Sequence, residues 1–198
     1  MAVTIISNNC SGARIQQDLK MQYCSPTIVL QILPEQYPKF CRNIKYYLKG
    51  CELVEYKDFS EDHRKKMETL IDRKVYFPCG LLDDVVVMFQ HYKTFEEAKE
   101  KWDRRVKRVD FKHMGFLFVL EKPYIKEAIE FGNSGLKNAV LFTNGFDVDV
   151  PIEHHRYDLK EGQEYLGRSP INGLRNFENG FDRKGWIKKI EESEVTND

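Results

Sequence analysis

Short apolar runs alternate along the chain with segments whose apolar residues recur at helical spacing. The first run, residues 2–6 (AVTII), is rich in β-branched residues and predicts a buried strand. Further strands are predicted at 26–32, 51–57, 74–77, 84–91, 115–120 and 138–143. Helices are predicted at 13–20, 35–48, 60–73, 94–108 and 123–131. A turn is predicted at "PCGLLD" (78–83), between two of the strands.

The helix at 94–108 has the clearest pattern. Thr94 precedes it as a cap, and Glu97, three positions on, completes a capping box. Phe95, Ala98 and Trp102 form its apolar stripe.

Beyond residue 145 the pattern weakens. Residues 151–181 hold many Gly, Asn, His and Arg residues and predict loops, so 146–181 is expected to be a loop-rich part. A short amphipathic helix is predicted at 182–192, followed by a frayed tail at 193–198.

Strands that alternate with helices predict an α/β fold. We expect a layered mixed or mainly parallel sheet with helices on both faces. No Pro- or Ser-rich linker divides the chain, so a single domain is expected over residues 1–192. In such sheets ligands collect beyond the carboxyl ends of the strands.

The chain carries 31 basic and 31 acidic residues, so its net charge is zero. This balance gives no general attraction for nucleic acid and makes any anion site local. The five cysteines form no CxxC pair, which favours reduced thiols in a cytoplasmic protein and no zinc site. His154 and His155 are adjacent and would point apart in a strand, so a metal site is not expected there either. No secretory signal is recognised, and no apolar stretch reaches the ~18 residues of a membrane span, which leaves peripheral membrane association open.

The turn "SNNCSG" between the first strand and helix is the first candidate site. Such a turn points N–H groups and a positive helix end into a crevice, so Ser7, Asn8, Asn9 and Gly12 are candidate binding residues. The same environment would make Cys10 a better nucleophile. The structural alternative is an Asx-rich turn whose side chains satisfy only local backbone groups.

His91 ends the strand predicted at 84–91 and is the best candidate for a general base. It could pair with a residue from another strand end, such as Cys10 or an asparagine. A structural role is the alternative. Asn144, in the turn "FTNG" after another strand, is a further candidate for substrate binding.

Arg104, Arg105 and Arg108 recur at helical spacing and form a basic flank beside Trp102. This flank could clamp a phosphate. The alternative is a solvated helix face that Glu96, Glu97 and Glu100 neutralise.

Five segments occur in an order that resembles a known family: "SNNCSG", "SPT" (25–27), "FPCGLLDDV", "FQHYKTFEEAKEKWDRRVKRV" and "FTNG". The pattern is similar to a bacterial family of unknown function whose members are often labelled exopolysaccharide biosynthesis proteins. The resemblance covers roughly residues 4–145. It implies a cytoplasmic α/β protein with a role in surface glycans, and it brings no established reaction. Ser11 and Cys79 depart from the bulkier and aliphatic residues typical of the family.

The leading hypothesis is a transferase of surface-glycan synthesis that uses an activated, phosphate-containing donor such as a nucleotide sugar. The turn at 7–12 would hold substrate oxygens, the three arginines would counter phosphate charge, and His91 would act as base. One alternative is a non-catalytic accessory or scaffold protein of glycan assembly. Another is a Cys10-dependent acyltransferase or hydrolase, which needs a base within hydrogen-bond reach of the sulfur. The sequence identifies no cofactor and no oligomeric state.

Overall fold

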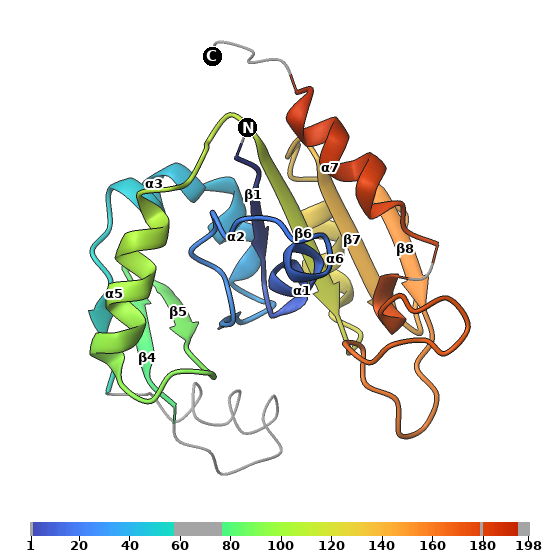
Figure 1. Ribbon diagram of the computed structural model, residues 1–198, viewed down its shortest axis with the longest axis horizontal. Helices are drawn as coiled ribbons and strands as arrows, with labels where there is room; N and C mark the ends of the chain where they lie inside the picture. The colour runs from blue at the N-terminus through green and yellow to red at the C-terminus, as the bar shows by residue number, and fades with distance from the viewer. Residues whose placement is uncertain (1, 58–76, 179, 194–198) are drawn as a thin grey trace.

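The computed structural model describes residues 2–57, 77–178 and 180–193. The helix predicted at 60–73 and most of the strand predicted at 74–77 lie outside these residues. The main sheet has four parallel strands in the order β1-β6-β7-β8 (Figure 1). Its strands are β1 (Thr4–Ser7), β6 (Met114–Leu120), β7 (Ala139–Asn144) and β8 (Glu153–Tyr157).

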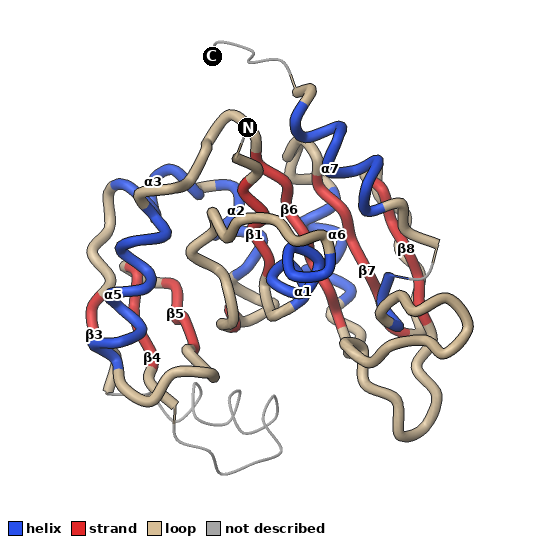
Figure 2. Tube along the Cα trace, viewed as in Figure 1, coloured by secondary structure: helices blue, strands red, loops and turns tan. Residues whose placement is uncertain are grey.

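A second, antiparallel sheet has the strand order β2-β5-β4-β3 (Figure 2). Its strands are β2 (Gln31–Ile32), β3 (Val54–Glu55), β4 (Cys79–Leu82) and β5 (Val85–Met88). The prediction of a turn at 78–83 is therefore wrong for most of its length, because Cys79–Leu82 pairs with β5. The strand predicted at 26–32 is shorter than expected and covers only Gln31–Ile32.

Helices cover both faces of the main sheet (Figure 1), which confirms the predicted α/β architecture in a single domain. They are α1 (Ser11–Asp18), α2 (Tyr37–Arg42), α3 (Ile44–Lys49), α5 (Phe95–Val106), α6 (Ile125–Gly132) and α7 (Arg183–Glu191), with a 3-10 turn η1 (Asn176–Glu178). The single helix predicted at 35–48 is two helices, because the chain leaves helical geometry at Asn43.

Successive side chains of β1 and β6 point to opposite faces of the main sheet and enter two separate apolar clusters. Ile5 and Leu117 face a cluster that includes Ile15 of α1 and Ile190 of α7. On the opposite face, residues of both strands pack against α2 and α6, together with part of the second sheet and α5. Because both faces are covered, β6 is buried along its whole length, as its continuous apolar sequence predicts.

Gly115 on β6 allows α7 to approach the sheet closely. A Cβ at this position would lie 2.5 Å from Ile190 Cδ1 and 2.6 Å from Trp186 Cζ2. The smallest residue therefore stands where a helix with two large side chains crosses the strand.

The prediction of loops over 151–181 is wrong for Glu153–Tyr157, which forms β8. This strand pairs only with β7 and lies at the edge of the sheet. Its residues are mostly polar, and only Tyr157 is fully buried. An edge strand of this kind lacks the apolar alternation that identifies a strand in a sequence.

Candidate functional site

The four parallel strands end at the same edge of the main sheet, and the turn after β1 leads there directly into α1. Ser7 Oγ donates to the carbonyl of Asn9 at 2.7 Å and accepts from the N–H of Gly12 at 3.3 Å. A Cβ on Gly12 would lie only 2.7 Å from Ser7 Oγ, so this approach needs glycine. Ser7 and Gly12 thus fix the start of the helix.

The two asparagines of the turn are buried and bonded within the protein. The side chain of Asn8 bonds both the N–H and the carbonyl of Val119 at 3.0 Å, joining β1 to β6. Asn9 Oδ1 accepts from the N–H of Ser11 at 3.1 Å and from its hydroxyl at 2.5 Å. Asn8 and Asn9 thus bond groups of the protein itself, as the alternative of a purely structural turn expects. Substrate binding by Ser7, Asn8, Asn9 and Gly12 stays a prediction.

The second sheet is attached at the same edge. The N–H of Ile32 on β2 donates to the carbonyl of Asn8 at 2.8 Å, directly beyond the end of β1. β5 pairs with β2, and Gln90, just after β5, donates to Gln31 at 2.5 Å. These links bring the loop after β5, which carries His91, to the start of α1.

Cys10 and His91 meet there. The Cys10 sulfur lies 3.5 Å from His91 Nε2, although 81 residues separate them in the sequence. Cys10 is buried and His91 is exposed. Both residues were candidates from the sequence, and the structure brings them within hydrogen-bond reach for sulfur.

Burial raises the pKa of the Cys10 thiol, and the positive charge of Arg14 opposes this shift. The resting thiol is therefore protonated at neutral pH, and a nucleophilic attack needs a base to remove its proton. His91 can be that base when its Nε2 is unprotonated, which is the tautomer with hydrogen on Nδ1.

The three predicted arginines lie on or directly after α5. Arg105 donates to the Tyr92 hydroxyl at 2.8 Å and to the Ile28 carbonyl at 3.3 Å, so it holds the residue next to His91. Arg104 is exposed and lies 3.8 Å from Glu100. Arg108 is exposed; burial raises the pKa of Cys24, and the charge of Arg108 opposes this shift. Phosphate binding by this flank stays a prediction.

Asn144, at the end of β7, joins neighbouring parts of the same edge. Its Nδ2 donates to the Glu121 carbonyl at 3.2 Å, and its Oδ1 accepts from the N–H of Leu159 at 3.0 Å. This bridge connects the end of β6 to the segment that follows β8. The role in substrate binding predicted for Asn144 stays a prediction.

Arg14 and Tyr165 lie near Cys10, and Glu121 lies near Tyr165; none of the three was identified from the sequence. Glu121 reaches solvent, yet enough protein surrounds it that desolvation raises its pKa. Burial raises the pKa of Tyr165, and the negative charges of Glu121 and of an ionised Cys10 act in the same direction. Arg14 alone had a sequence signal, since it follows Cys10 by one helical turn.

A buried ionic cluster fastens the segment that carries Tyr165. Asp18, 7% exposed, accepts from Arg168 at 2.6 Å and from Arg175 at 3.1 Å, and it lies 3.6 Å from Arg183. Arg183 also contacts Glu178 at 3.2 Å. The cluster ties Arg168, Arg175 and Arg183 to the end of α1, the helix that follows Cys10.

A hollow of about 430 Å³ lies away from this site. It is lined by Ala2, Val3, Met21, Gln22, Cys24 and Glu191. Ala2 and Val3 precede β1, so the hollow is at the amino edge of the sheet, opposite to Cys10. Its lining includes no residue of the predicted site.

Within the described ranges, no three His, Cys, Asp or Glu side chains are grouped so that they could hold a metal ion. His154 bonds the Thr143 hydroxyl at 2.7 Å, and His155 bonds Glu153 at 2.7 Å. The same ranges contain no helix with the length and apolar character of a membrane span.

The sequence profile of a family described as "Domain of unknown function (DUF1919)" matches residues 1–155. The chain belongs to the DUF1919 family. The matched residues include Cys10, Arg14 and His91, and the match ends before Tyr165. An uncharacterized protein of Haemophilus influenzae is 28% identical over 193 residues, which cover 93% of this chain and 84% of the relative. DUF1919 is thus a family of unknown function, as the sequence predicted, and neither description mentions surface glycans.

Proposed function

We propose that this protein is a cysteine-dependent acyl-transfer enzyme of surface-glycan biosynthesis. The observation that carries the proposal is the 3.5 Å distance between the Cys10 sulfur and His91 Nε2. A thiol and an imidazole at this distance form a nucleophile and its base. Cys10 also directly precedes α1, whose positive end favours negative charge that develops beside the sulfur.

The reaction has two steps. First, the Cys10 thiol gives its proton to His91 while its sulfur forms a bond to the carbonyl carbon of an acyl donor. The bond from that carbon to the leaving oxygen or sulfur breaks, and the leaving group takes the proton from His91. Second, an acceptor hydroxyl gives its proton to His91, and its oxygen bonds to the thioester carbon. The carbon–sulfur bond breaks, and the Cys10 sulfur takes the proton back.

The glycan acceptor in this proposal rests on the resemblance of five sequence segments to proteins labelled as exopolysaccharide biosynthesis proteins. A glycan supplies many hydroxyl groups, which are the acceptors that the second step needs. A cytoplasmic location is part of the same proposal, because activated acyl donors are made there. Water as acceptor would turn the same chemistry into hydrolysis.

Acylation by a small ester tests the proposal. The protein is mixed with p-nitrophenyl acetate, and nitrophenolate release and the mass of the protein are followed together. We expect one acetyl group on Cys10, located by peptide mass spectrometry. His91→Gln should slow this acylation by about 10²–10⁴-fold, the usual contribution of a general base. Cys51→Ser, at a half-buried thiol, is the matched control and should acylate like the natural protein.

Two results would contradict the proposal. One is the absence of acetyl groups on Cys10 after long incubation while p-nitrophenyl acetate labels other side chains. The other is an unchanged rate of Cys10 acylation in His91→Gln.

A non-catalytic accessory role has one observation in its favour. Ile125 and Ile129 lie one turn apart on α6 and are 50% and 43% exposed. Exposed apolar pairs of this kind can contact a partner protein. A host that keeps its surface glycan with Cys10→Ser and loses it with Ile129→Glu would favour this role over acyl transfer.

Glycosyl transfer from a nucleotide sugar, the leading hypothesis from the sequence, has a separate test. Calorimetric titration with a panel of nucleotide sugars should show binding that Arg104→Gln and Arg108→Gln weaken. Tight binding of a nucleotide sugar together with an inert Cys10 would favour glycosyl transfer.

A further inference from the structure

Arg14 lies on the same side of α1 as Cys10. Cys10 has helical backbone angles, and the N–H of Arg14 donates to the Cys10 carbonyl at 3.1 Å. Residues with this spacing have Cβ atoms about 5–6 Å apart on a helix surface. Burial raises the pKa of Cys10 and that of Tyr165, and the positive charge of Arg14 opposes both shifts.

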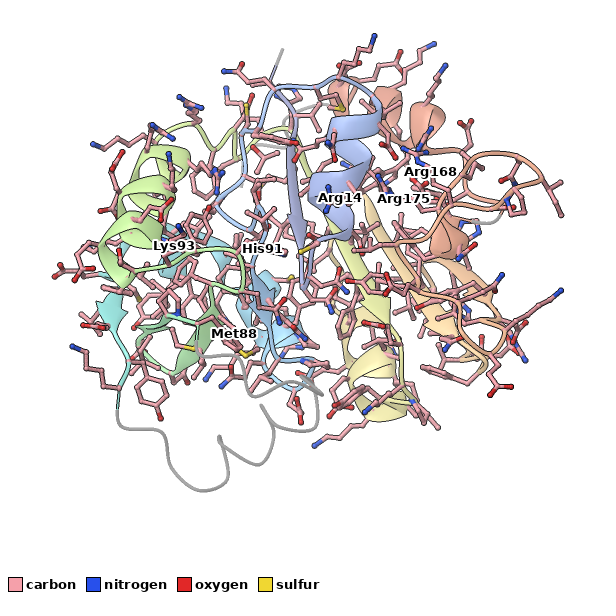
Figure 3. The ribbon with its side chains drawn as sticks, turned by 60° about the horizontal axis from the view of Figure 1, so that its bottom comes forward. Arg14, Met88, His91, Lys93, Arg168 and Arg175 are labelled. Carbon is pink, nitrogen blue, oxygen red and sulfur yellow. The ribbon has the colours of Figure 1, made fainter. Side chains whose placement is uncertain are left out.

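The guanidinium of Arg14 has no carboxylate partner within the described ranges. Its one hydrogen bond there goes to the neutral Gln17 Oε1 at 2.9 Å. In contrast, carboxylates pair with the arginines of the ionic cluster, Arg168, Arg175 and Arg183. Figure 3 shows Arg14 and His91 at the edge of the sheet that this view brings forward, with Arg168 and Arg175 beyond Arg14.

A half-buried guanidinium with unused donors is an anion-binding group. Its planar N–H groups match the oxygens of a phosphate or a carboxylate in a bidentate contact. Beside a nucleophile, such a group selects the molecule that the nucleophile attacks. Gln17 can turn away at little cost, because it lies on the exposed side of the helix.

We propose that Arg14 is a specificity residue that binds an oxyanion group of the acyl donor, a phosphate or a carboxylate, while Cys10 attacks the acyl carbon. This inference rests on the proposed acyl transfer. The oxyanion can belong to the leaving group, as in a phosphate-bearing thioester, or to the acyl group itself, as in a dicarboxylic acyl chain.

Two matched pairs of donors separate these sources. The first pair is acetyl-coenzyme A, with phosphates on the leaving group, and S-acetyl-N-acetylcysteamine, its neutral counterpart. The second pair is mono-p-nitrophenyl succinate, with a carboxylate on the acyl group, and p-nitrophenyl acetate. For each pair, the ratio of kcat/KM for the anionic donor to that for the neutral donor is measured. A change in the nucleophilicity of Cys10 cancels in this ratio, so only recognition of the anion remains.

Arg14→Gln should lower the ratio by roughly tenfold to a hundredfold in one pair, the effect of losing a charge-assisted hydrogen bond. The affected pair identifies which part of the donor carries the oxyanion. Arg14→Lys keeps the charge without the planar fork and should lower the same ratio by a smaller factor. The matched control is Arg156→Gln, an exposed arginine paired with Asp147 and Asp158, which should leave both ratios unchanged.

Failure of the inference is distinct from failure of the proposed function. If Cys10 is acylated and both ratios are the same in Arg14→Gln as in the natural protein, Arg14 does not select the donor. If none of the four donors acylates Cys10 in the natural protein, acyl transfer itself is refuted. Circular dichroism melting of each variant, compared with that of the natural protein, identifies a loss of folding.

Discussion

Removing the charge of Asp18 from its ionic cluster should lower the free energy of unfolding. The substitution is Asp18→Asn, which keeps the size of the side chain and removes its charge. Asp18 is 7% exposed, and its closest buried partner, Arg175, is 11% exposed. Arg175 contacts both carboxylate oxygens at 3.1 Å through Nε and Nη2. Removal of the carboxylate therefore leaves a buried guanidinium without its bidentate partner.

Breaking a buried ion pair from one side costs about 3–5 kcal/mol, because the remaining charge stays desolvated. Arg168 adds little to this cost, since it is half exposed and solvent can replace its partner. Arg183 keeps Glu178 as a partner. We therefore expect the lower end of the range, about 3 kcal/mol, and a fall in Tm of about 6–12 °C for a chain of this length.

Urea unfolding followed by circular dichroism measures this free energy. Asp147→Asn is the matched control, because Asp147 is 67% exposed and its pair with Arg156 lies in solvent. This control should change the unfolding free energy by less than about 1 kcal/mol. Limited trypsin digestion adds a local measurement, since cleavage after Arg168 and Arg175 should be faster in Asp18→Asn. Equal unfolding free energies for the two variants would refute the argument that burial sets the strength of the cluster.

Three further predictions concern the thiols and the packing of the core. Alkylation of Cys10 by iodoacetamide, mapped by mass spectrometry, should rise with pH into the alkaline range, because burial raises its pKa; a neutral-pH plateau would contradict this. Burial also raises the pKa of Cys79, from 9.0 to about 12. The unfolded chain then releases a proton that the folded chain keeps, so the unfolding free energy should fall by about 1.4 kcal/mol per pH unit between these two values. Cys79→Ala should remove the part of this pH dependence that Cys79 causes. If the unfolding free energy of Cys79→Ala falls with pH as steeply as that of the natural protein, Cys79 is not the group responsible. Gly115→Ala should destabilise the protein by about 1–3 kcal/mol in urea unfolding, because its Cβ would overlap Trp186; an unchanged midpoint would show that α7 moves away freely.

The central strands of the main sheet, β6 and β7, could be predicted from the sequence because they are continuous apolar runs, buried on both sides. β4 could not, because Pro78 and Gly80 are residues typical of turns. In the structure Gly80 has a packing reason. A Cβ there would lie 2.5 Å from Leu53 Cδ1, so glycine lets Leu53 cover the strand. Such a tertiary contact leaves no local pattern.

The candidate site was predicted in part for a similar reason. Cys10 and His91 were selected by residue type and by their positions at strand ends. Their distance depends on the bond between Ile32 and Asn8, which attaches the second sheet to the end of β1. The chemistry of the turn side chains was also ambiguous in the sequence. An asparagine before a helix can bind a ligand or its own backbone, and only the position of Val119 decides the contacts of Asn8.

The strand order of the main sheet has a consequence for synthesis on the ribosome. β1 pairs with β6, and the Asn9 side chain bonds Val119, which follows 110 residues later. At about 5–20 residues per second, the ribosome needs roughly 5–20 s to make the chain between them. During this interval Ile5 and Ile6 have no neighbouring strand to bury them, and the turn that carries Cys10 lacks the carbonyl that fixes it. The nascent chain therefore exposes apolar residues of the kind that chaperones bind, and the Cys10 turn gains its bonds to Val119 only after β6 has left the ribosome.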